Sequence, residues 1–262
     1  MSVAIDLSGK VAIVTGGGDG IGKACALMQA KAGATVFIAD INEDNAKAVV
    51  EEIKSTYGTP ASYCKCNVSS KADVDAMVDA CVKEFGTVDI LNHVAGVSKA
   101  VHFMELDEEM YDRIFDINVK GTYLVDQAVL RVMIPKKCGK IVNMSSMSGK
   151  VGYPTNVAYS ASKFAVMGFT QAISKAMAPY NINVNAVCPG IVMTAIWENF
   201  LKDMKARGDD VDAYWEQRMS AIPLHRPQTP EDIAHMVVYL SSPFADNMTG
   251  QGINITGGLI TN

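Results

Sequence analysis

A tyrosine and a lysine four positions apart are the residues of this sequence best suited to acid–base chemistry. Tyr159 and Lys163 open a helical pattern, with Ser-Ala-Ser between them. Residues at this spacing lie on one face of a helix, one turn apart. A neighbouring ammonium favours the phenolate, so it lowers the pKa of a tyrosine from its usual value of about 10. The pair predicts a general acid or base working near neutral pH, although such a spacing is common by chance.

Two serines and one asparagine occupy positions that fit the same chemistry. Ser145 and Ser146 follow an apolar, strand-like segment, and open parallel sheets bind ligands where their strands end. Either hydroxyl would hold a substrate oxygen while the tyrosine exchanges its proton. Asn118 lies inside a long helical pattern, where asparagine has poor propensity. We expect its side-chain amide to bind a water molecule that relays protons through the lysine.

A glycine-rich segment near the N-terminus predicts a dinucleotide site. Residues 15–22 read Thr-Gly-Gly-Gly-Asp-Gly-Ile-Gly, between an apolar run and a helical pattern. Glycines let the backbone approach a pyrophosphate, which the helix N-terminus then attracts. Such a segment alone is weak evidence, because it also suits a plain turn. The order of strand, glycines, helix and second strand favours the dinucleotide interpretation.

Acidic residues near this segment favour NAD over NADP. Asp40 ends the second apolar run, roughly twenty residues past the glycines, where a carboxylate can bind both adenosine ribose hydroxyls. It would repel a 2'-phosphate, and Asp19 adds a second negative charge. Ile41 and Asn42 follow, so no arginine is offered to that phosphate. The alternative is that Asp40 only caps the end of its strand.

The elements that would position these residues alternate between strand and helix. We expect a single α/β domain over residues 1–262, with a Rossmann-type doubly wound parallel sheet of about seven strands and helices on both faces. A long helix is expected over 107–130 and another over 159–178. Residues 193–229 depart from the alternation and predict one inserted helical lid over the substrate. The strands are expected at 11–14, 35–39, 61–66, 88–91, 140–144, 182–188 and 252–255.

Composition excludes several other classes of protein. The 262 residues carry a net charge of −5, so nothing suggests a nucleic-acid partner. The six cysteines are scattered without a zinc-binding pattern, and we expect no metal site. No secretory signal and no membrane-spanning run is recognisable. These features favour a protein of the reducing cytoplasm.

Taken together, the motifs resemble those of the short-chain dehydrogenase/reductase family, across essentially the whole chain. The resemblance rests on five features: the Thr-Gly-x-x-x-Gly-Ile-Gly segment, Asn118, Ser146, Tyr159-x-x-x-Lys163, and the Pro-Gly-x-x-x-Thr segment at 189–194. The family's catalytic serine stands thirteen positions before the tyrosine, which selects Ser146 over Ser145. The resemblance implies a catalytic tetrad of Asn118, Ser146, Tyr159 and Lys163.

The resemblance also implies how a dinucleotide is held. Lys163 would bind the nicotinamide ribose, while the backbone of Val192 and the hydroxyl of Thr194 would hold the carboxamide. Asn67 and Val68 match the position that meets adenine, although the family usually has Asp in place of Asn67. The implied cofactor residues are Gly16, Asp19, Gly20, Ile21, Asp40, Ile41, Asn67, Val68, Val94, Ala95, Gly96, Tyr159, Lys163, Val192 and Thr194.

Two segments depart from the family pattern. Where the family usually shows Asn-Asn-Ala-Gly, this chain has His93 and Val94 before Ala95 and Gly96. Backbone contacts there survive, and we expect His93 to be a core histidine that braces the sheet. Near the C-terminus the family's Asp-Gly-Gly begins here with Thr256, which puts any contact made by that aspartate in doubt.

The implied reaction interconverts a secondary alcohol and a ketone with NAD, and Tyr159 is the acid or base. The expected substrate contacts are Ser146, Ser148, Tyr153, Tyr159 and Trp197. Polar members of this set favour a polyol, a sugar alcohol or a small hydroxy-ketone. Apolar lid residues suit a hydroxysteroid or another ring alcohol instead. A catalytically silent dinucleotide-binding regulator is the alternative of another class. Family members are usually homotetramers, and some are homodimers, so we expect an oligomer.

Overall fold

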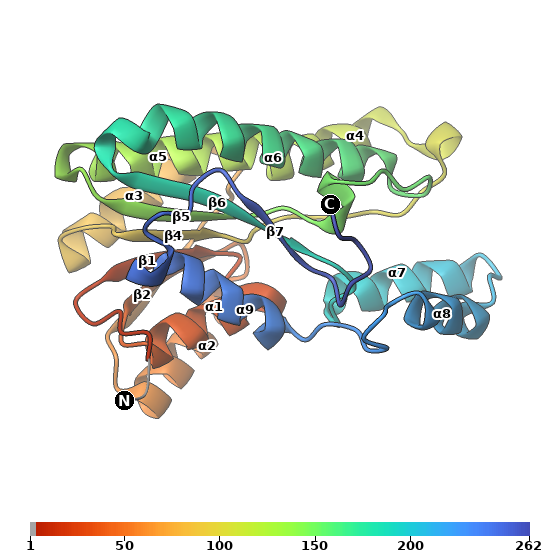
Figure 1. The fold of residues 1–262 in the computed structure, drawn as a ribbon, viewed down its shortest axis with the longest axis horizontal. Helices are drawn as coiled ribbons and strands as arrows, with labels where there is room; N and C mark the ends of the chain where they lie inside the picture. The colour runs from red at the N-terminus through yellow and green to blue at the C-terminus, as the bar shows by residue number, and fades with distance from the viewer. Residues whose placement is uncertain (1–3) are drawn as a thin grey trace.

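Seven parallel strands form one sheet at the centre of the molecule (Figure 1). The structure is a computed structural model that describes residues 4–262. Its strand order, β3-β2-β1-β4-β5-β6-β7, confirms the predicted doubly wound α/β fold. The strands are β1 Val11–Thr15, β2 Thr35–Asp40, β3 Ala61–Lys65, β4 Ile90–His93, β5 Gly139–Met144, β6 Ile182–Pro189 and β7 Gly252–Ile255.

Helices cover both faces of this sheet (Figure 1). Helices α1, α2 and α9 pack on one face, and α3, α4, α5 and α6 on the other. Every residue of β1 and β4 is buried, as expected for strands covered on both sides. The helices are α1 Gly20–Lys31, α2 Glu43–Tyr57, α3 Lys71–Phe85, α4 Glu108–Phe115, α5 Gly121–Lys136, α6 Val157–Met177, α7 Ala195–Ala206, α8 Val211–Ser220 and α9 Pro230–Ser241.

The segment expected to be a long helix over 107–130 is helical without a break over residues 108–136, but its middle turn is not α-helical. A π-helical turn, Asp116–Lys120, separates α4 from α5, and Asn118 lies within it. Such turns interrupt α-helices mostly at functional sites. Asn118, a residue of poor helix propensity, therefore marks an irregularity of the helix backbone.

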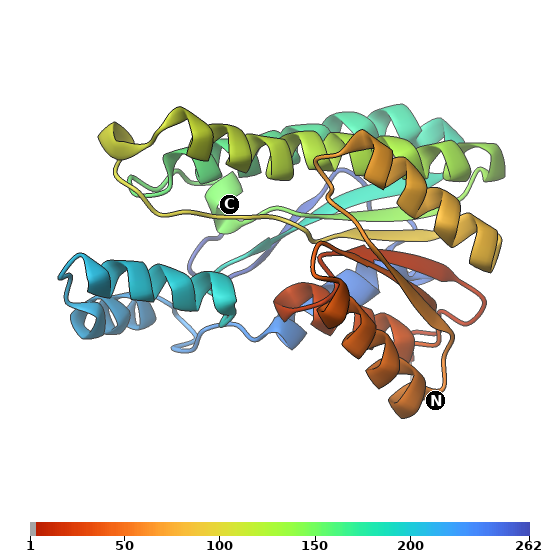
Figure 2. The same cartoon turned by 180° about the vertical axis from the view of Figure 1, so that it is seen from behind.

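The expected single lid helix is two helices. Helices α7 and α8 project beyond the edge of the sheet, joined by a short turn (Figure 2). Gly208 in that turn has a φ of +87°, a conformation that glycine adopts at little cost. Asp210 caps the second helix by accepting a hydrogen bond from Ala213 N. Residues 221–229 then return to the sheet face without regular structure.

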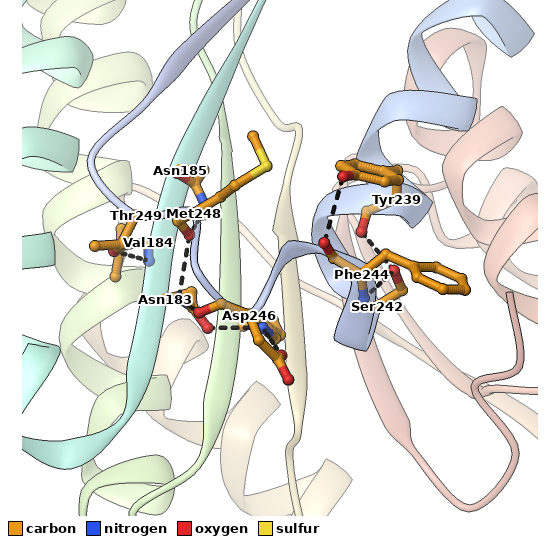
Figure 3. Close-up of polar contacts among 10 residues, drawn as sticks. Asn183, Val184, Asn185, Tyr239, Ser242, Phe244, Asp246, Met248 and Thr249 are labelled. Carbon is orange, nitrogen blue, oxygen red and sulfur yellow. Dashed lines mark hydrogen bonds and ion pairs between the residues drawn. The ribbon is translucent and has the colours of Figure 1, made fainter.

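The segment between α9 and β7 is fastened to β6 by side-chain amides (Figure 3). Asn183 Nδ2 donates to the carbonyls of Asp246 and Met248, and Asn185 Nδ2 donates to Met248 as well. Val184 N donates to the hydroxyl of Thr249 at 3.1 Å. These bonds satisfy two backbone carbonyls of the connection and one N–H of β6, and they hold the connection to β7 beside β6.

Strand order reverses between β1 and β4, which places a crevice at the carboxyl ends of these two strands. Thr15 pairs with His93 across this point, and His93 pairs in turn with Asn143. The loops that follow β1, β4, β5 and β6 therefore converge at one edge of the sheet. The fold brings the glycine segment and the Tyr159 helix to that same edge.

Candidate active site

A cavity of about 430 Å³ opens at this edge of the sheet. It brings together nearly all of the residues expected to bind cofactor or substrate. Of the expected residues, its lining includes Gly16, Asp19, Gly20, Ile21, Asp40, Ile41, Asn67, Val68, Val94, Ala95, Gly96, Ser146, Ser148, Tyr159, Lys163, Val192, Thr194 and Trp197. Asn118 and Tyr153 lie outside the lining.

The glycine segment leaves no room for side chains at its tightest points. Gly16 has a φ of +65°, and a Cβ added there would lie 2.9 Å from the Cα of Ala95. A Cβ on Gly22 would lie 1.9 Å from the carbonyl oxygen of Gly16. The backbone can therefore approach a ligand closely, and the N-terminus of α1 points its free N–H groups there.

Asp40 stands at the end of β2 with a carboxylate that is only half engaged. Its Oδ2 accepts from Gly18 N and its Oδ1 from Asn42 N, both at 2.9 Å. A carboxylate can accept about four hydrogen bonds, so capacity remains for the hydroxyls of a ribose. The strand-end cap and the ribose contact are therefore compatible roles for Asp40.

Asp19 has a structural role at the start of α1 that the sequence analysis did not predict. It is the N-cap of α1, and its Oδ1 accepts from Gly20 N at 2.7 Å. Its negative charge is thus placed against the positive end of the helix dipole. The carboxylate still lines the cavity, so it adds to the negative charge there.

Asn67 presents an amide whose oxygen is already used. Its Oδ1 accepts from both the backbone N and the hydroxyl of Ser69, at 3.1 and 2.8 Å. A backbone N–H requires an oxygen as its partner, so this fixes the orientation of the amide. Asn67 therefore has only its Nδ2 donor to offer to a ligand in the cavity.

Tyr159 lies in the first turn of α6, beside Ser146 at the end of β5. Desolvation raises the pKa of Tyr159, and a hydrogen bond with Ser146 lowers it by less. The expected depression of this pKa by the lysine is therefore wrong for the protein alone. Burial outweighs the ammonium because the two groups are not in direct contact.

Lys163 is anchored to the last residue of β5. Its Nζ donates to the carbonyl of Met144 at 2.8 Å and lies 5.7 Å from the centroid of the Tyr159 ring. The side chain is 4% exposed, and burial lowers the pKa of Lys163 to about 8. The ammonium remains the charged form at neutral pH, and two of its three N–H donors are available to a ligand.

The two serines at the end of β5 have separate tasks. Ser145 is buried, and its hydroxyl donates to the carbonyl of Lys163 at 3.0 Å. Ser146 Oγ accepts from Ser148 N at 3.0 Å, which leaves its proton free to face the cavity and the tyrosine. The geometry therefore favours Ser146, and not Ser145, as the catalytic serine.

The side-chain amide of Asn118 makes hydrogen bonds within the protein, and the expected water relay stays a prediction. Its Oδ1 accepts from Val97 N at 2.9 Å, and its Nδ2 donates to Val97 O and to the hydroxyl of Ser162. Both N–H donors and one acceptor position of the amide therefore brace the segment after β4 against α6. A Cβ added to Gly96 would lie 3.2 Å from Asn118 Oδ1 and 3.3 Å from Lys163 Nζ, so the bracing acts beside the lysine.

His93 is buried in the sheet, as expected for a bracing residue. It is 2% exposed, and its Nδ1 lies 2.8 Å from the hydroxyl of Thr15. Burial lowers the pKa of His93 to about 3, and the charge of Lys163 acts in the same direction. The ring is therefore neutral at physiological pH.

The lid contributes one of its expected residues to the cavity. Trp197 lines it, and its ring also lies 5.0 Å from that of Phe200 and 6.3 Å from that of Trp215. Tyr153 instead packs in an apolar cluster under the lid, where the Arg218 guanidinium lies 5.7 Å from its ring. Tyr153 thus lies outside the cavity lining, and its contact with a substrate stays a prediction.

Sequence reasoning missed several parts of the site. Val97, Arg113, Ile117 and Asn156 line the cavity without belonging to a recognisable motif. The role of Ser162 was the one feature that the sequence could have revealed, because Ser162 lies between Tyr159 and Lys163. Its hydroxyl accepts a hydrogen bond from the amide of Asn118. The four lining residues lie in α4, in the π-helical turn and in two loops, and only tertiary packing brings them together, which leaves no local pattern.

Comparison with known proteins identifies the family. The family model described as short chain dehydrogenase matches residues 10–205. The chain belongs to this short-chain dehydrogenase family. Among curated proteins, it is 37% identical to a 3-oxoacyl-[acyl-carrier-protein] reductase of Thermotoga maritima over 97% of this chain and 99% of the other. It is also 37% identical to a diacetyl reductase, (S)-acetoin forming, of Staphylococcus epidermidis, over 96% of this chain and 98% of the other.

Solved structures of the family superpose closely on this chain. A NAD⁺-bound xylitol dehydrogenase matches with a TM-score of 0.92 and 32% identity, covering 96% of this chain and 99% of the other. An actinorhodin polyketide ketoreductase with NADPH matches with a TM-score of 0.91 and 33% identity, covering 98% and 99%. The chain is therefore an oxidoreductase of a fold that binds a nicotinamide dinucleotide, and the glycine cradle and the Asp40 carboxylate fit that group.

Neither a membrane-spanning helix nor a cluster of metal ligands is found among the residues that the structure describes. Over residues 4–262, no helix is both long and apolar enough to cross a bilayer. In the same range, no three His, Cys, Asp or Glu side chains gather closely enough to hold a metal ion.

Proposed function

We propose that this short-chain dehydrogenase interconverts a secondary alcohol and a ketone with NAD. The observation that carries the proposal is the convergence of Ser146, Tyr159 and Lys163 on one cavity that also contains the Asp40 carboxylate. A phenol, a hydroxyl donor and an ammonium are the groups needed to move a proton at a substrate oxygen. A purely regulatory dinucleotide-binding protein has no need of that set.

When bound, the nicotinamide ring supplies the hydride chemistry. Ser146 donates its free proton to the substrate oxygen and steadies the charge that develops there. Tyr159 accepts the hydroxyl proton in the oxidative direction and returns it in the reductive direction. Lys163 would bind the neighbouring ribose with the N–H donors that its bond to the Met144 carbonyl leaves free. The ammonium is suited to this because it is charged below its pKa of about 8.

NAD rather than NADP is favoured by the charge around the adenosine end of the cavity. Asp40 and Asp19 both line it, and a 2'-phosphate would meet two carboxylates. The residue after Asp40 is Ile41, which is 66% exposed and offers no charge. Desolvated like charges are costly at such short range, so the phosphorylated cofactor should bind much more weakly.

A polyol, a sugar alcohol or a small hydroxy-ketone is the substrate class we propose. Ser146 and Ser148 are buried and line the same cavity as Trp197. Two hydroxyls suit a substrate that carries a second oxygen beside the reacting carbon. Similarity to the diacetyl reductase supports this class, because that relative is named for a small diketone. A ring alcohol such as a hydroxysteroid is the runner-up, favoured by the apolar rings of Trp197 and Phe200.

Helices α7 and α8 are proposed to act as a lid over the substrate, within residues 193–229. Helix α7 lines the cavity with Trp197 and Phe200, and α8 packs against α7 through Trp215. Lys99, in the segment after β4, pairs with Asp203 of α7 at 2.5 Å. Figure 2 shows that segment passing from β4 toward α4 beside the lid helices. An exposed pair of this kind is weak and can break when a substrate enters.

Assembly into a homotetramer, or a homodimer, in the cytoplasm is part of the proposal. The outer faces of α5 and α6 expose Tyr123 and Phe164, which are 45% and 47% accessible. Exposed apolar side chains on adjacent helices are typical of surfaces that associate. All six cysteines are free thiols in the structure, as a reducing compartment would keep them.

The experiment that tests the proposed function is a panel of substrates assayed for NADH formation and consumption. The panel includes vicinal diols and hydroxy-ketones, polyols, hydroxysteroids and 3-oxoacyl thioesters, each with NAD(H) and NADP(H). The proposal expects turnover of a diol, polyol or hydroxy-ketone with NAD(H). Turnover of the thioester with NADPH alone would replace it by a ketoacyl reductase, and no turnover at all would favour a regulator.

A further inference from the structure

The hydroxyl of Thr15 has two acceptor positions and one proton, and the structure accounts for all three. Its Oγ1 accepts from Val94 N at 3.2 Å and from Ala95 N at 3.3 Å. With both lone pairs used, the hydroxyl proton must point at His93 Nδ1, which lies 2.8 Å away. His93 Nδ1 is therefore an acceptor, and the ring carries its proton on Nε2.

The Nε2–H that results is buried and has no partner among the described protein atoms. Two buried acceptors, Asn143 Oδ1 and Asp126 Oδ1, likewise have no hydrogen-bond partner among the described protein atoms. All three side chains are at most 2% exposed. An unpaired buried polar group costs about 1–3 kcal/mol, so three of them in one region require an explanation.

These atoms belong to one layer of the fold. His93 and Asn143 are register partners in β4 and β5, so their side chains leave the same face of the sheet. Helices α5 and α6 cover that face. Asn143 Nδ2 donates to Asp126 Oδ2 of α5 at 3.0 Å and to Thr170 Oγ1 of α6 at 3.4 Å.

We propose that His93 Nε2, Asn143 Oδ1 and Asp126 Oδ1 bind one buried water molecule, which makes His93 a positioning residue for the cofactor loop. One donor and two acceptors match a water that accepts from Nε2–H and donates to both oxygens. Three hydrogen bonds are the usual number for an internal water. If Asp126 is protonated, the water accepts from its O–H instead and the site remains satisfied.

The water acts on the loop through the tautomer of His93. A histidine with a proton on Nδ1 would donate to Thr15 Oγ1 and compete with the amides of Val94 and Ala95. The water prevents this by stabilising the Nε2–H form. Burial lowers the pKa of His93 to about 3, and the charged group on α6, Lys163, opposes protonation as well. Asp126 on α5 faces the same layer, and burial raises its pKa to about 7.

The loop held in this way, residues 94–96, lines the cavity together with Lys163. A Cβ added to Gly96 would lie 3.3 Å from Lys163 Nζ and 3.2 Å from Asn118 Oδ1, so the loop passes close to both side chains. A shift of the loop would therefore displace both the cofactor surface and the lysine. This consequence for cofactor binding rests on the proposed function, whereas the water site and the tautomer do not.

The first test is NMR of the protein with ¹⁵N-labelled histidine, in the absence of cofactor. His93→Asn identifies the signals of His93 among the four histidines. The proposal expects a neutral ring with an unprotonated Nδ1 and a protonated Nε2, and a cross-peak between the Nε2 proton and a long-lived water. A proton on Nδ1, a charged ring, or a missing water cross-peak would overturn it, whatever the enzyme turns over.

The second test separates positioning from a merely structural role. His93→Phe removes both nitrogens, and we expect the KM for NAD to rise roughly five- to tenfold, the equivalent of one lost hydrogen bond, while kcat at saturating NAD changes less than twofold. His93→Asn should restore the KM, because an amide can accept from Thr15 and still reach the water. His235→Asn, on α9, is the matched control. An unchanged KM in His93→Phe, or a kcat that falls alone, contradicts the positioning role.

Discussion

Lys163 Nζ lies 5.7 Å from the centroid of the Tyr159 ring and donates to the carbonyl of Met144 instead of the phenol. The two residues are thus neighbours on one helical face without direct contact. In the protein alone, desolvation raises the pKa of Tyr159. An activated phenolate therefore requires more than this pair, and the bound, positively charged nicotinamide is the group the proposed function adds. Activity should accordingly be more sensitive to Tyr159 than cofactor binding is.

Removing the phenol hydroxyl tests this directly. Tyr159→Phe should lower kcat by about 10²–10⁴-fold, the usual contribution of one positioned acid or base. The Kd for NADH, followed by nicotinamide fluorescence, should change less than about twofold since the ring remains. A variant that keeps more than a tenth of wild-type kcat would refute the assignment of Tyr159.

The two serines after β5 form a matched pair. Ser146→Ala should lower kcat by about 10²-fold, because it removes a donor to the developing oxygen charge. Ser145→Ala removes a buried bond to the Lys163 carbonyl and should cost about 1 kcal/mol of unfolding free energy with little loss of kcat. Steady-state kinetics and denaturant unfolding of both variants check the division. If Ser145→Ala lowered kcat more than Ser146→Ala does, Ser145 would be the catalytic serine and Ser146 the structural one.

Cofactor preference should follow the charge at the end of β2. Asp40→Ala combined with Ile41→Arg removes a carboxylate and supplies a cation for the 2'-phosphate. The ratio of kcat/KM for NAD to that for NADP should fall by at least about 10²-fold, since two charge contacts change together. Asp40→Asn is the control that removes charge without adding a cation. A ratio that stays constant in both variants would dismiss the ribose contact.

The lid tryptophans separate substrate contact from packing. Trp197 lines the cavity, whereas Trp215 supports it from behind without lining it. Trp197→Ala should raise the KM for a small hydroxy-ketone roughly tenfold, and Trp215→Ala should do so much less. The KM for NAD serves as the internal reference. Equal effects of the two substitutions on the KM for the hydroxy-ketone would mean that Trp197 only packs the lid.

The buried pair His93 and Asp126 should give opposite pH dependences of stability. The folded pKa of His93 is about 3 against 6.5 ordinarily, so the unfolded chain binds more protons between these values and stability rises with pH. The folded pKa of Asp126 is about 7 against 3.8, so the folded chain binds more protons and stability falls as pH rises through that window. Between about pH 4 and 6.5 the two contributions oppose each other.

Urea unfolding at several pH values resolves these contributions. The stability of wild type relative to His93→Asn should increase with pH, by up to about 1.4 kcal/mol per pH unit. Relative to Asp126→Asn it should decrease with a similar slope. Parallel pH profiles for wild type and both variants would show that neither group titrates as the buried site requires.

The sheet and the catalytic motif were accessible from the sequence because each leaves a local signal. Buried parallel strands read as continuous apolar runs, and the Tyr159 helix carries its chemistry within one turn. The π-helical turn at Asn118 was not accessible in this way, since a single inserted residue barely alters a helical pattern. The occupied amide of Asn118 depends on the backbone of Val97, which packing alone places beside it.

The central claim, hydride exchange between a secondary alcohol and NAD, is tested most directly with a deuterated substrate. A vicinal diol carrying deuterium on its carbinol carbon is incubated with the enzyme and NAD, and the reduced cofactor is examined by mass spectrometry and NMR. We predict one deuterium on the nicotinamide ring of NADH, and none with Tyr159→Phe over the same time. The absence of label for every alcohol tested, or label in NADPH only, would contradict the claim.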